Sequence, residues 1–139
     1  MSEVPGQGSI GRSILSVVAG FIAVVVLSLG TDILLHYVAG FPKLGQIYSD
    51  PQFLWATIYR TVYGVVGSYI TAALAPRRPM KHALIGGCIG LVFASLGVVA
   101  SIVAGPKMGP LWYPVALFVG VLPTAWLGGQ IRVMQTAPR

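Results

Sequence analysis

Charged side chains are scarce in this sequence of 139 residues. They make up 9% of the chain, whereas soluble globular domains carry about 25%. Hydrophobic residues make up 55%. This composition excludes an ordinary soluble domain, and with it the basic face on a soluble fold that a nucleic-acid-binding protein requires. The sequence therefore predicts an integral membrane protein in contact with the lipid bilayer.

Cysteine and histidine are also rare. Cys88 is the only cysteine, which excludes an intrachain disulfide and a paired-cysteine redox site. The two histidines, His36 and His82, fall near opposite membrane faces, so they cannot share a metal ion. No nucleophile is placed beside an acid and a histidine in the way that covalent catalysis requires. We therefore expect no metal, no cofactor and no enzymatic activity.

Long apolar runs are what the sequence has in abundance. A helix needs roughly 20 apolar residues to cross about 30 Å of hydrocarbon, and four runs are near that length. The predicted spans cover residues 14–38, 53–75, 83–104 and 111–132. We expect a single all-α, four-helix transmembrane bundle over residues 10–133. Residues 1–9, which lack apolar periodicity, predict a disordered tail, and residues 134–139 a second short tail.

Basic residues predict the orientation of these spans. With the amino terminus inside, six basic residues lie on the cytoplasmic side and only Lys43 and Lys107 lie outside. The six are Arg12, Arg77, Arg78, Lys81, Arg132 and Arg139. Both termini should therefore be cytoplasmic. The turn that contains Arg77, Arg78 and Lys81 should lie against the inner leaflet, where it could also contact anionic headgroups.

Aromatic residues gather at the opposite ends of the predicted spans. They are Tyr37, Phe41, Tyr48, Phe53, Trp55 and Tyr59 around the first hairpin, and Trp112 and Tyr113 at the second. Rings with one polar edge are typical of the headgroup level of a bilayer. We therefore interpret this set as interface anchors.

Two charges, Asp32 and Arg60, fall inside the apolar runs. Asp32 should lie about 9 Å below the outer end of the first span, and Arg60 about 10 Å below the start of the second. Because adjacent spans pack antiparallel and an isolated charge in lipid is costly, we expect these residues to form an ion pair. His36 is one turn beyond Asp32, and Tyr63 shares the face of Arg60, so the prediction is a polar cluster of all four.

Two interpretations of this cluster stay open. In one, Asp32 and His36 form a proton relay or ion site, and Arg60 sets the charge state of the carboxylate or binds an anion. In the other, the ion pair fixes the register of the first two helices. A transport path normally needs polar residues at successive depths. The inner half of the spans offers mainly hydroxyls, which often bond to their own helix backbone.

Small residues recur at helical spacing in the last three spans. They are Gly64 and Gly67 in the second, Gly86, Gly90 and Gly97 in the third, and Gly120 and Gly128 in the fourth. Small residues let helix backbones approach closely in lipid, so these positions predict helix packing and favour a homo-oligomer or other membrane subunits. Pro123, in the middle of the fourth span, predicts a kink there.

Three stretches carry a resemblance to known proteins. They are residues 60–64 (Arg-Thr-Val-Tyr-Gly), 75–84 (Ala-Pro-Arg-Arg-Pro-Met-Lys-His-Ala-Leu) and 109–114 (Gly-Pro-Leu-Trp-Tyr-Pro). The chain resembles a group of small uncharacterised bacterial four-span inner-membrane proteins, and the resemblance implies a multi-pass protein of the inner membrane without implying an activity. We expect an interaction, accessory-subunit or self-assembling structural role. The alternative is a small proton-coupled or ion-conducting transporter or channel that uses the intramembrane Asp, His and Arg cluster.

Overall fold

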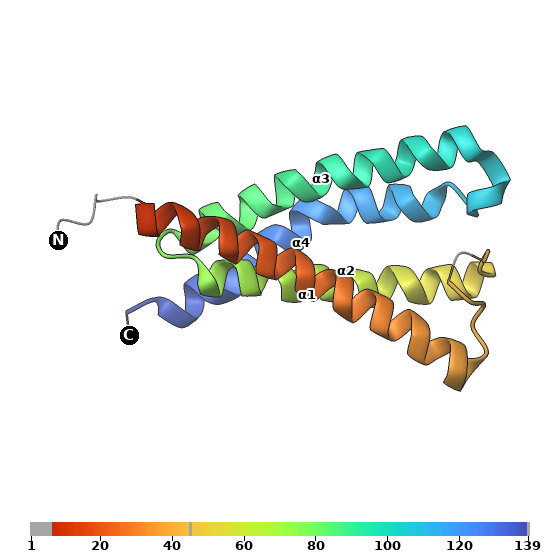
Figure 1. The fold of residues 1–139 in the computed structure, drawn as a ribbon, viewed down its shortest axis with the longest axis horizontal. Coiled ribbons are helices and arrows are strands. Elements are labelled where there is room, and N and C mark those ends of the chain that lie inside the picture. The colour runs from red at the N-terminus through yellow and green to blue at the C-terminus, as the bar shows by residue number, and fades with distance from the viewer. Residues whose placement is uncertain (1–6, 45, 139) are drawn as a thin grey trace.

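The computed structural model describes residues 7–44 and 46–138, and this part of the chain is all-α (Figure 1). The four long helices are α1 (Gln7–Ala39), α2 (Asp50–Leu74), α3 (Pro79–Ala104) and α4 (Trp112–Thr136). A short 3-10 helix, η1 (Gly105–Met108), lies between the last two. The expected all-α, four-helix bundle is therefore confirmed.

Three of the four helices are long and apolar enough to cross a membrane. They are α1 from Gly8 onward, α3 together with η1, and α4, with mean hydropathies of 2.5, 2.3 and 1.4. α2 is 25 residues long, or about 37 Å at 1.5 Å per residue, but it is not among the three. Asp50, Gln52 and Arg60 interrupt its apolar sequence and lower its hydropathy. Length and composition therefore support three of the four predicted spans.

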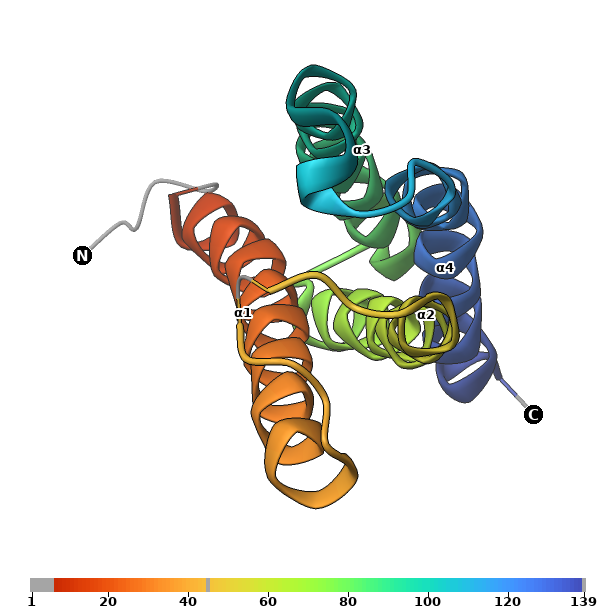
Figure 2. The same cartoon turned by 90° about the vertical axis from the view of Figure 1, so that its right-hand side faces the viewer.

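α2 is the central helix, because it packs extensively against both α1 and α4 and also contacts α3. Figure 2 shows α2 between α1 and α4. Within the described residues α1 packs along α2, touches α3 less extensively and does not approach α4. The helices converge where α1 begins and α4 ends, which we call the basic end because residues 75–78 lie there. At the other end, called the loop end, where residues 40–49 and η1 lie, α1 and α3 diverge (Figures 1 and 2).

The helix ends follow glycine and proline. α1 stops at Ala39 because Gly40 adopts a φ of +67°, and the N–H of Phe41 then donates to the carbonyl of Leu35 at 3.2 Å. α3 begins at a proline, which suits the first helical position. The residue before it, Arg78, has a φ of +51° and reverses the chain between α2 and α3.

Two helices extend into segments that the sequence predicts as tails. α1 begins at Gln7, so residues 7–9 of the expected disordered tail are helical, and residues 1–6 lie outside the described residues. α4 continues to Thr136, into the expected carboxyl-terminal tail. No proline occurs in either extension, so the helical hydrogen bonds continue through both.

The interior of the bundle is made of small side chains. The residues at most 2% exposed include Ala56, Ala72, Ala83 and Ala125. The large apolar side chains point outward instead, and Phe93 and Val103 of α3 are 63% and 82% exposed. This distribution suits a bilayer, where close packing between helices, and not the removal of apolar surface from water, drives their association.

Glycines bring the helix backbones together at two of the predicted packing positions. A Cβ atom on Gly67 of α2 would lie 2.8 Å from the carbonyl oxygen of Gly20 on α1. A Cβ atom on Gly128 of α4 would lie 2.5 Å from the carbonyl oxygen of Val65 on α2. Both distances are too short for a real Cβ contact, so a larger residue at either position would force the helices apart.

The other five predicted packing glycines differ in how closely a neighbouring helix approaches them. Cβ atoms on Gly64 and Gly90 would meet side chains of α4 at 3.2 and 3.3 Å, and one on Gly86 would meet α2 at 3.9 Å. Cβ atoms on Gly97 and Gly120 would have no neighbouring atom within 4 Å. These last two glycines therefore do not bring helices together within the chain.

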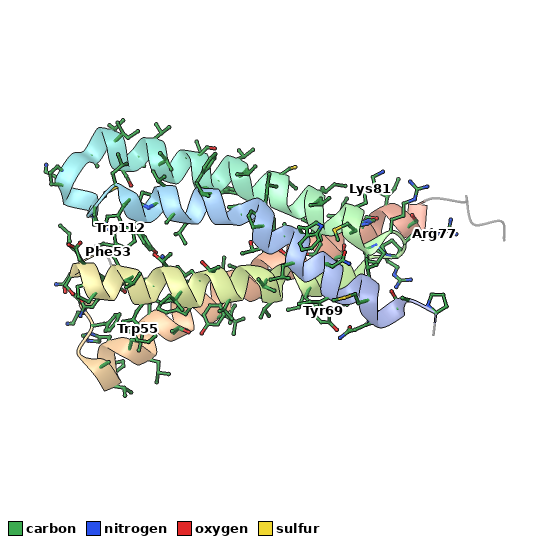
Figure 3. The ribbon with its side chains drawn as sticks, turned by 180° about the vertical axis from the view of Figure 1, so that it is seen from behind. Phe53, Trp55, Tyr69, Arg77, Lys81 and Trp112 are labelled. Carbon is green, nitrogen blue, oxygen red and sulfur yellow. The ribbon has the colours of Figure 1, made fainter. Side chains whose placement is uncertain are left out.

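Pro123 lies inside α4, as the sequence predicts. Its ring nitrogen carries no hydrogen, so the carbonyl of Val119 lacks its helical partner. Figure 3 shows α4 changing direction partway along its length. This bend carries the end of α4 across the basic end of the bundle.

Candidate functional site

Asp32 of α1 and Arg60 of α2 form an ion pair near the loop end, with 2.5 Å between Nη2 and Oδ2. The side chain of Asp32 is 2% exposed and that of Arg60 is 28% exposed. The two residues meet because α1 and α2 are antiparallel neighbours and each residue lies about two or three turns from the connecting loop. Each charge compensates the other at a depth where a lone charge would be costly.

Two tyrosines extend the ion pair into a hydrogen-bonded network. The Tyr59 hydroxyl of α2 donates to Oδ1 of Asp32. Nη1 of Arg60 donates to the Tyr113 hydroxyl of α4. We call these four residues the polar network, and it joins α1, α2 and α4. The sequence predicts Tyr59 and Tyr113 as interface anchors, and only their contacts with the ion pair distinguish them from the other aromatic residues.

The guanidinium of Arg60 is held by aromatic rings as well as by hydrogen bonds. Its central carbon lies 5.9 Å from the ring centroid of Tyr59 and 5.8 Å from that of Tyr113. Both distances fit a cation–π contact. Within the described part of the chain, Nε of Arg60 is buried and has no hydrogen-bond partner. Arg60 thus retains one unused donor in a buried position.

The other two residues of the predicted cluster bond elsewhere. Nδ1 of His36 lies 2.6 Å from the carbonyl oxygen of Phe41, so this ring bridges the turn after α1 and does not contact the ion pair. The Tyr63 hydroxyl lies 2.6 Å from Oγ1 of Thr31 and provides a separate link between α1 and α2. The structure therefore brings together Asp32 and Arg60 but not the whole expected cluster.

Aromatic rings cover the polar network on the loop side. The ring centroids of Phe41 and Tyr48 are 5.5 Å apart, those of Tyr48 and Phe53 are 5.4 Å apart, and those of Phe53 and Tyr113 are 4.8 Å apart. Figure 3 shows Phe53 and Trp112 near each other at this end. Burial raises the pKa of the Tyr48 phenol above its ordinary value; the charge of Asp32 acts in the same direction and that of Arg60 opposes it.

A cavity of about 230 Å³, the loop-end cavity, lies on this side of the ion pair. Its charged lining residues are Asp32, Arg60 and Lys107, which together carry a net charge of +1. Its other lining residues are Leu44, Gln46, Ile47, Tyr48, Phe53, Met108 and Tyr113. The cavity therefore combines an apolar wall with a small group of charged residues of positive balance.

A second cavity of about 250 Å³, the mid-bundle cavity, lies among all four helices. Two thirds of its lining residues are glycines or small hydroxyl residues. These are Gly20, Gly64, Gly67, Gly86, Gly87, Gly90, Gly120, Ser28, Thr61, Ser68, Thr71 and Thr124, and the remaining lining residues are Phe21, Val24, Arg60, Ala83, Leu117 and Val121. Arg60 is its only charged lining residue among those that the structure describes. Arg60 also lines the loop-end cavity, and it is the one described residue that the two linings share.

The basic turn lies at the opposite end of the molecule from this site. Figure 3 shows Arg77 and Lys81 together there, and Arg78 is the left-handed residue between them in the chain. Nε2 of His82 lies 2.8 Å from Oγ of Ser13 and links α3 to α1 at this end. His36 and His82 therefore sit at different ends of the bundle.

In residues 7–44 and 46–138, no group of three or more His, Cys, Asp or Glu side chains could hold a metal ion. The chain matches no protein-family model, no curated protein and no solved structure. The described residues form a small four-helix protein in which three helices are long and apolar enough to span a membrane, with an ion pair whose Arg60 lines two cavities.

Proposed function

We propose that the protein spans the inner membrane of a bacterium four times, with α2 as the fourth span and both termini in the cytoplasm. α2 supports this proposal because it is as long as α4 and packs against the other three helices. The basic turn at one end and the aromatic residues at the other fit a cytoplasmic and an outer membrane face.

For the role of the bundle, we propose transport of a small anionic solute through the site at Arg60. One observation carries this proposal: Arg60 lines both cavities, so a solute bound in either of them would lie beside this residue. Arginine binds carboxylates and phosphates through its planar array of donors. A structural ion pair alone would not require a cavity on each side.

The contacts of Arg60 suggest how an anion would bind. Asp32 accepts a hydrogen bond from Nη2 of Arg60, so an arriving anion competes with this carboxylate for the guanidinium. Tyr59 and Tyr113 hold the two groups in place and act as positioning residues. His36 is not part of this mechanism.

The test is uptake of radiolabelled phosphate, butyl phosphate and decyl phosphate into liposomes that contain the purified full chain. We expect uptake of at least one of them above that of protein-free vesicles. Arg60→Gln should abolish this uptake, whereas Lys43→Gln, which removes an exposed positive charge at the same end, should not. Arg60→Lys keeps a charge beside Asp32 and provides a second variant if Arg60→Gln does not fold. Equal uptake with and without Arg60 would refute the proposal.

A second candidate is the interaction, accessory-subunit or self-assembling role. It is favoured by Gly30 of α1, which is exposed and where a Cβ atom would have no neighbour within 4 Å. A small residue that faces outward would allow the helix of a second copy or of another subunit to approach. Native mass spectrometry decides between the two roles. A defined complex that Gly30→Leu dissociates would support this role, and a monomer would refute it.

A further inference from the structure

The mid-bundle cavity differs in chemistry from the ion pair that borders it. Its wall is formed by glycines from every helix, including Gly20 of α1, Gly64 of α2, Gly86 of α3 and Gly120 of α4, together with apolar side chains such as Phe21. Its volume of about 250 Å³ is close to the lower end of the range for small-molecule sites. The cavity is therefore large enough for a ligand but is mainly apolar.

Five lining residues of this cavity carry hydroxyl groups. Oγ1 of Thr61 donates to the carbonyl of Thr57 at 2.6 Å, and Oγ1 of Thr124 donates to the carbonyl of Val121 at 2.9 Å, so these two hydroxyls are bonded to their own helices. The other three hydroxyls are too few to replace the water shell of a hydrated ion, whereas an apolar chain needs no such partners.

The polar part of the cavity is concentrated at Arg60. Its Nε is buried without a hydrogen-bond partner in the described part of the chain, and Lys107 lies in the lining of the adjoining loop-end cavity. Asp32 offsets only one of these two positive charges. An anionic group at the boundary of the two cavities would therefore be stabilised, and any apolar part attached to it would extend into the mid-bundle cavity.

From this arrangement we infer that the ligand is an amphiphile with a single apolar chain and an anionic head, either a carboxylate or a phosphate. The chain occupies the mid-bundle cavity, and the head lies at Arg60. This inference rests on the proposed function and names its class of solute. The same recognition of the head would apply to a membrane-derived lipid and to free phosphate, so the test must separate these two sources.

The test uses the full chain in lipid nanodiscs and a decyl phosphate that carries a photoreactive diazirine in its chain. After irradiation, mass spectrometry locates the labelled residues. We expect labels on residues that line the cavity, such as Phe21 and Val121. Gly86→Leu should reduce this labelling at least about tenfold, because the leucine side chain fills the cavity. A Cβ atom on Gly86 would lie 3.9 Å from Cγ2 of Thr71, which is an ordinary van der Waals contact. The first carbon of the new side chain therefore fits without a clash.

The matched control is Gly97→Leu. It makes the same substitution on the same helix, at a position that does not line the cavity and where a Cβ atom would have no neighbour within 4 Å. Labelling of the cavity should be unchanged in this variant. Gly86→Ala, which adds a single methyl group, should give an intermediate loss and replaces Gly86→Leu if that variant does not fold.

The head is tested by competition and by a neutral probe. The corresponding photoreactive decanol should label the cavity less than the phosphate does, and Arg60→Gln should remove this difference. Inorganic phosphate should compete poorly with decyl phosphate. Competition by inorganic phosphate that equals competition by decyl phosphate would overturn the inference, because the chain would then contribute nothing. Labels found mainly on outward-facing residues such as Phe93, or unchanged by Gly86→Leu, would also overturn it.

The outcomes distinguish this inference from the proposed function. Cavity labelling without any uptake that depends on Arg60 would support the amphiphile and refute transport. Uptake of inorganic phosphate that depends on Arg60 but is unaffected by Gly86→Leu would support transport and refute the amphiphile.

Discussion

Arg60 of α2 donates one hydrogen bond to Asp32 of α1 and another to the hydroxyl of Tyr113 on α4. In the described part of the chain α1 does not approach α4, so this one side chain connects two helices that do not touch. Removal of any member of the polar network should therefore affect the whole loop end of the bundle and not only a local contact.

Asp32→Asn should destabilise the protein strongly. The substitution leaves the guanidinium of Arg60 without a compensating charge, and the loss of one partner from a buried ion pair costs about 3–5 kcal/mol. The midpoint of thermal unfolding in a fixed detergent should fall accordingly. Asp50→Asn, at the exposed start of α2, should have little effect. The double variant with Arg60→Gln should be more stable than Asp32→Asn alone, and failure of this recovery would argue against a direct pairing.

Tyr113→Phe should destabilise the loop end by about 1–3 kcal/mol, because Nη1 of Arg60 loses its acceptor in a partly buried position. Tyr69→Phe is the matched control, since its hydroxyl donates to Oε1 of Gln135 at 2.7 Å but at an exposed position of the α2 and α4 pair. Thermal unfolding should separate the two variants. Equal effects would mean that the Arg60 contact contributes no more than a surface hydrogen bond.

Gly67→Ala should lower stability through overpacking. The added methyl group would lie 2.8 Å from the carbonyl oxygen of Gly20, so α1 and α2 would have to separate, at a cost of about 1–3 kcal/mol. Gly97→Ala adds the same methyl group where no atom lies within 4 Å and should be neutral. A lower unfolding midpoint is expected for the first variant only. If both behaved alike, the close approach of α1 and α2 would be in doubt.

The proposed orientation predicts that the two ends of α2 face opposite sides of the membrane. In a Cys88→Ser background, Gln46→Cys before α2 should react with a membrane-impermeant maleimide on intact cells. Arg77→Cys after α2 should react only when the membrane is permeabilised. Reaction of both from the same side would show that α2 does not cross the bilayer, and the reverse pattern would show that the termini are outside.

Much of the fold could be predicted because lipid imposes a simple rule on helix length and polarity. The four apolar runs correspond to the four helices. The pairing of Asp32 with Arg60 could be expected from depth alone, since both lie at a similar distance from the same loop and a lone charge is costly there. The hydropathy of α2 shows the limit of this rule, because a central helix shielded by its neighbours can carry more polar residues than an exposed one.

The rest of the site depends on the three-dimensional arrangement. Tyr113 lies 53 residues after Arg60, and nothing in its local sequence distinguishes a partner of the ion pair from an interface anchor. His36 shares a helical face with Asp32. However, the turn at Gly40 places the carbonyl oxygen of Phe41 within hydrogen-bonding distance of the His36 ring. The mid-bundle cavity exists because α1 packs mainly on α2, and spacing along a single helix cannot predict that asymmetry.

Native mass spectrometry of the full chain, extracted with its surrounding lipids into polymer-bounded nanodiscs, tests the central claim most directly. We predict a bound anionic amphiphile on the wild-type protein that is lost from Gly86→Leu and from Arg60→Gln and retained by Gly97→Leu. A wild-type protein that carries no such molecule would contradict the account. So would a bound molecule that Arg60→Gln and Gly86→Leu both retain.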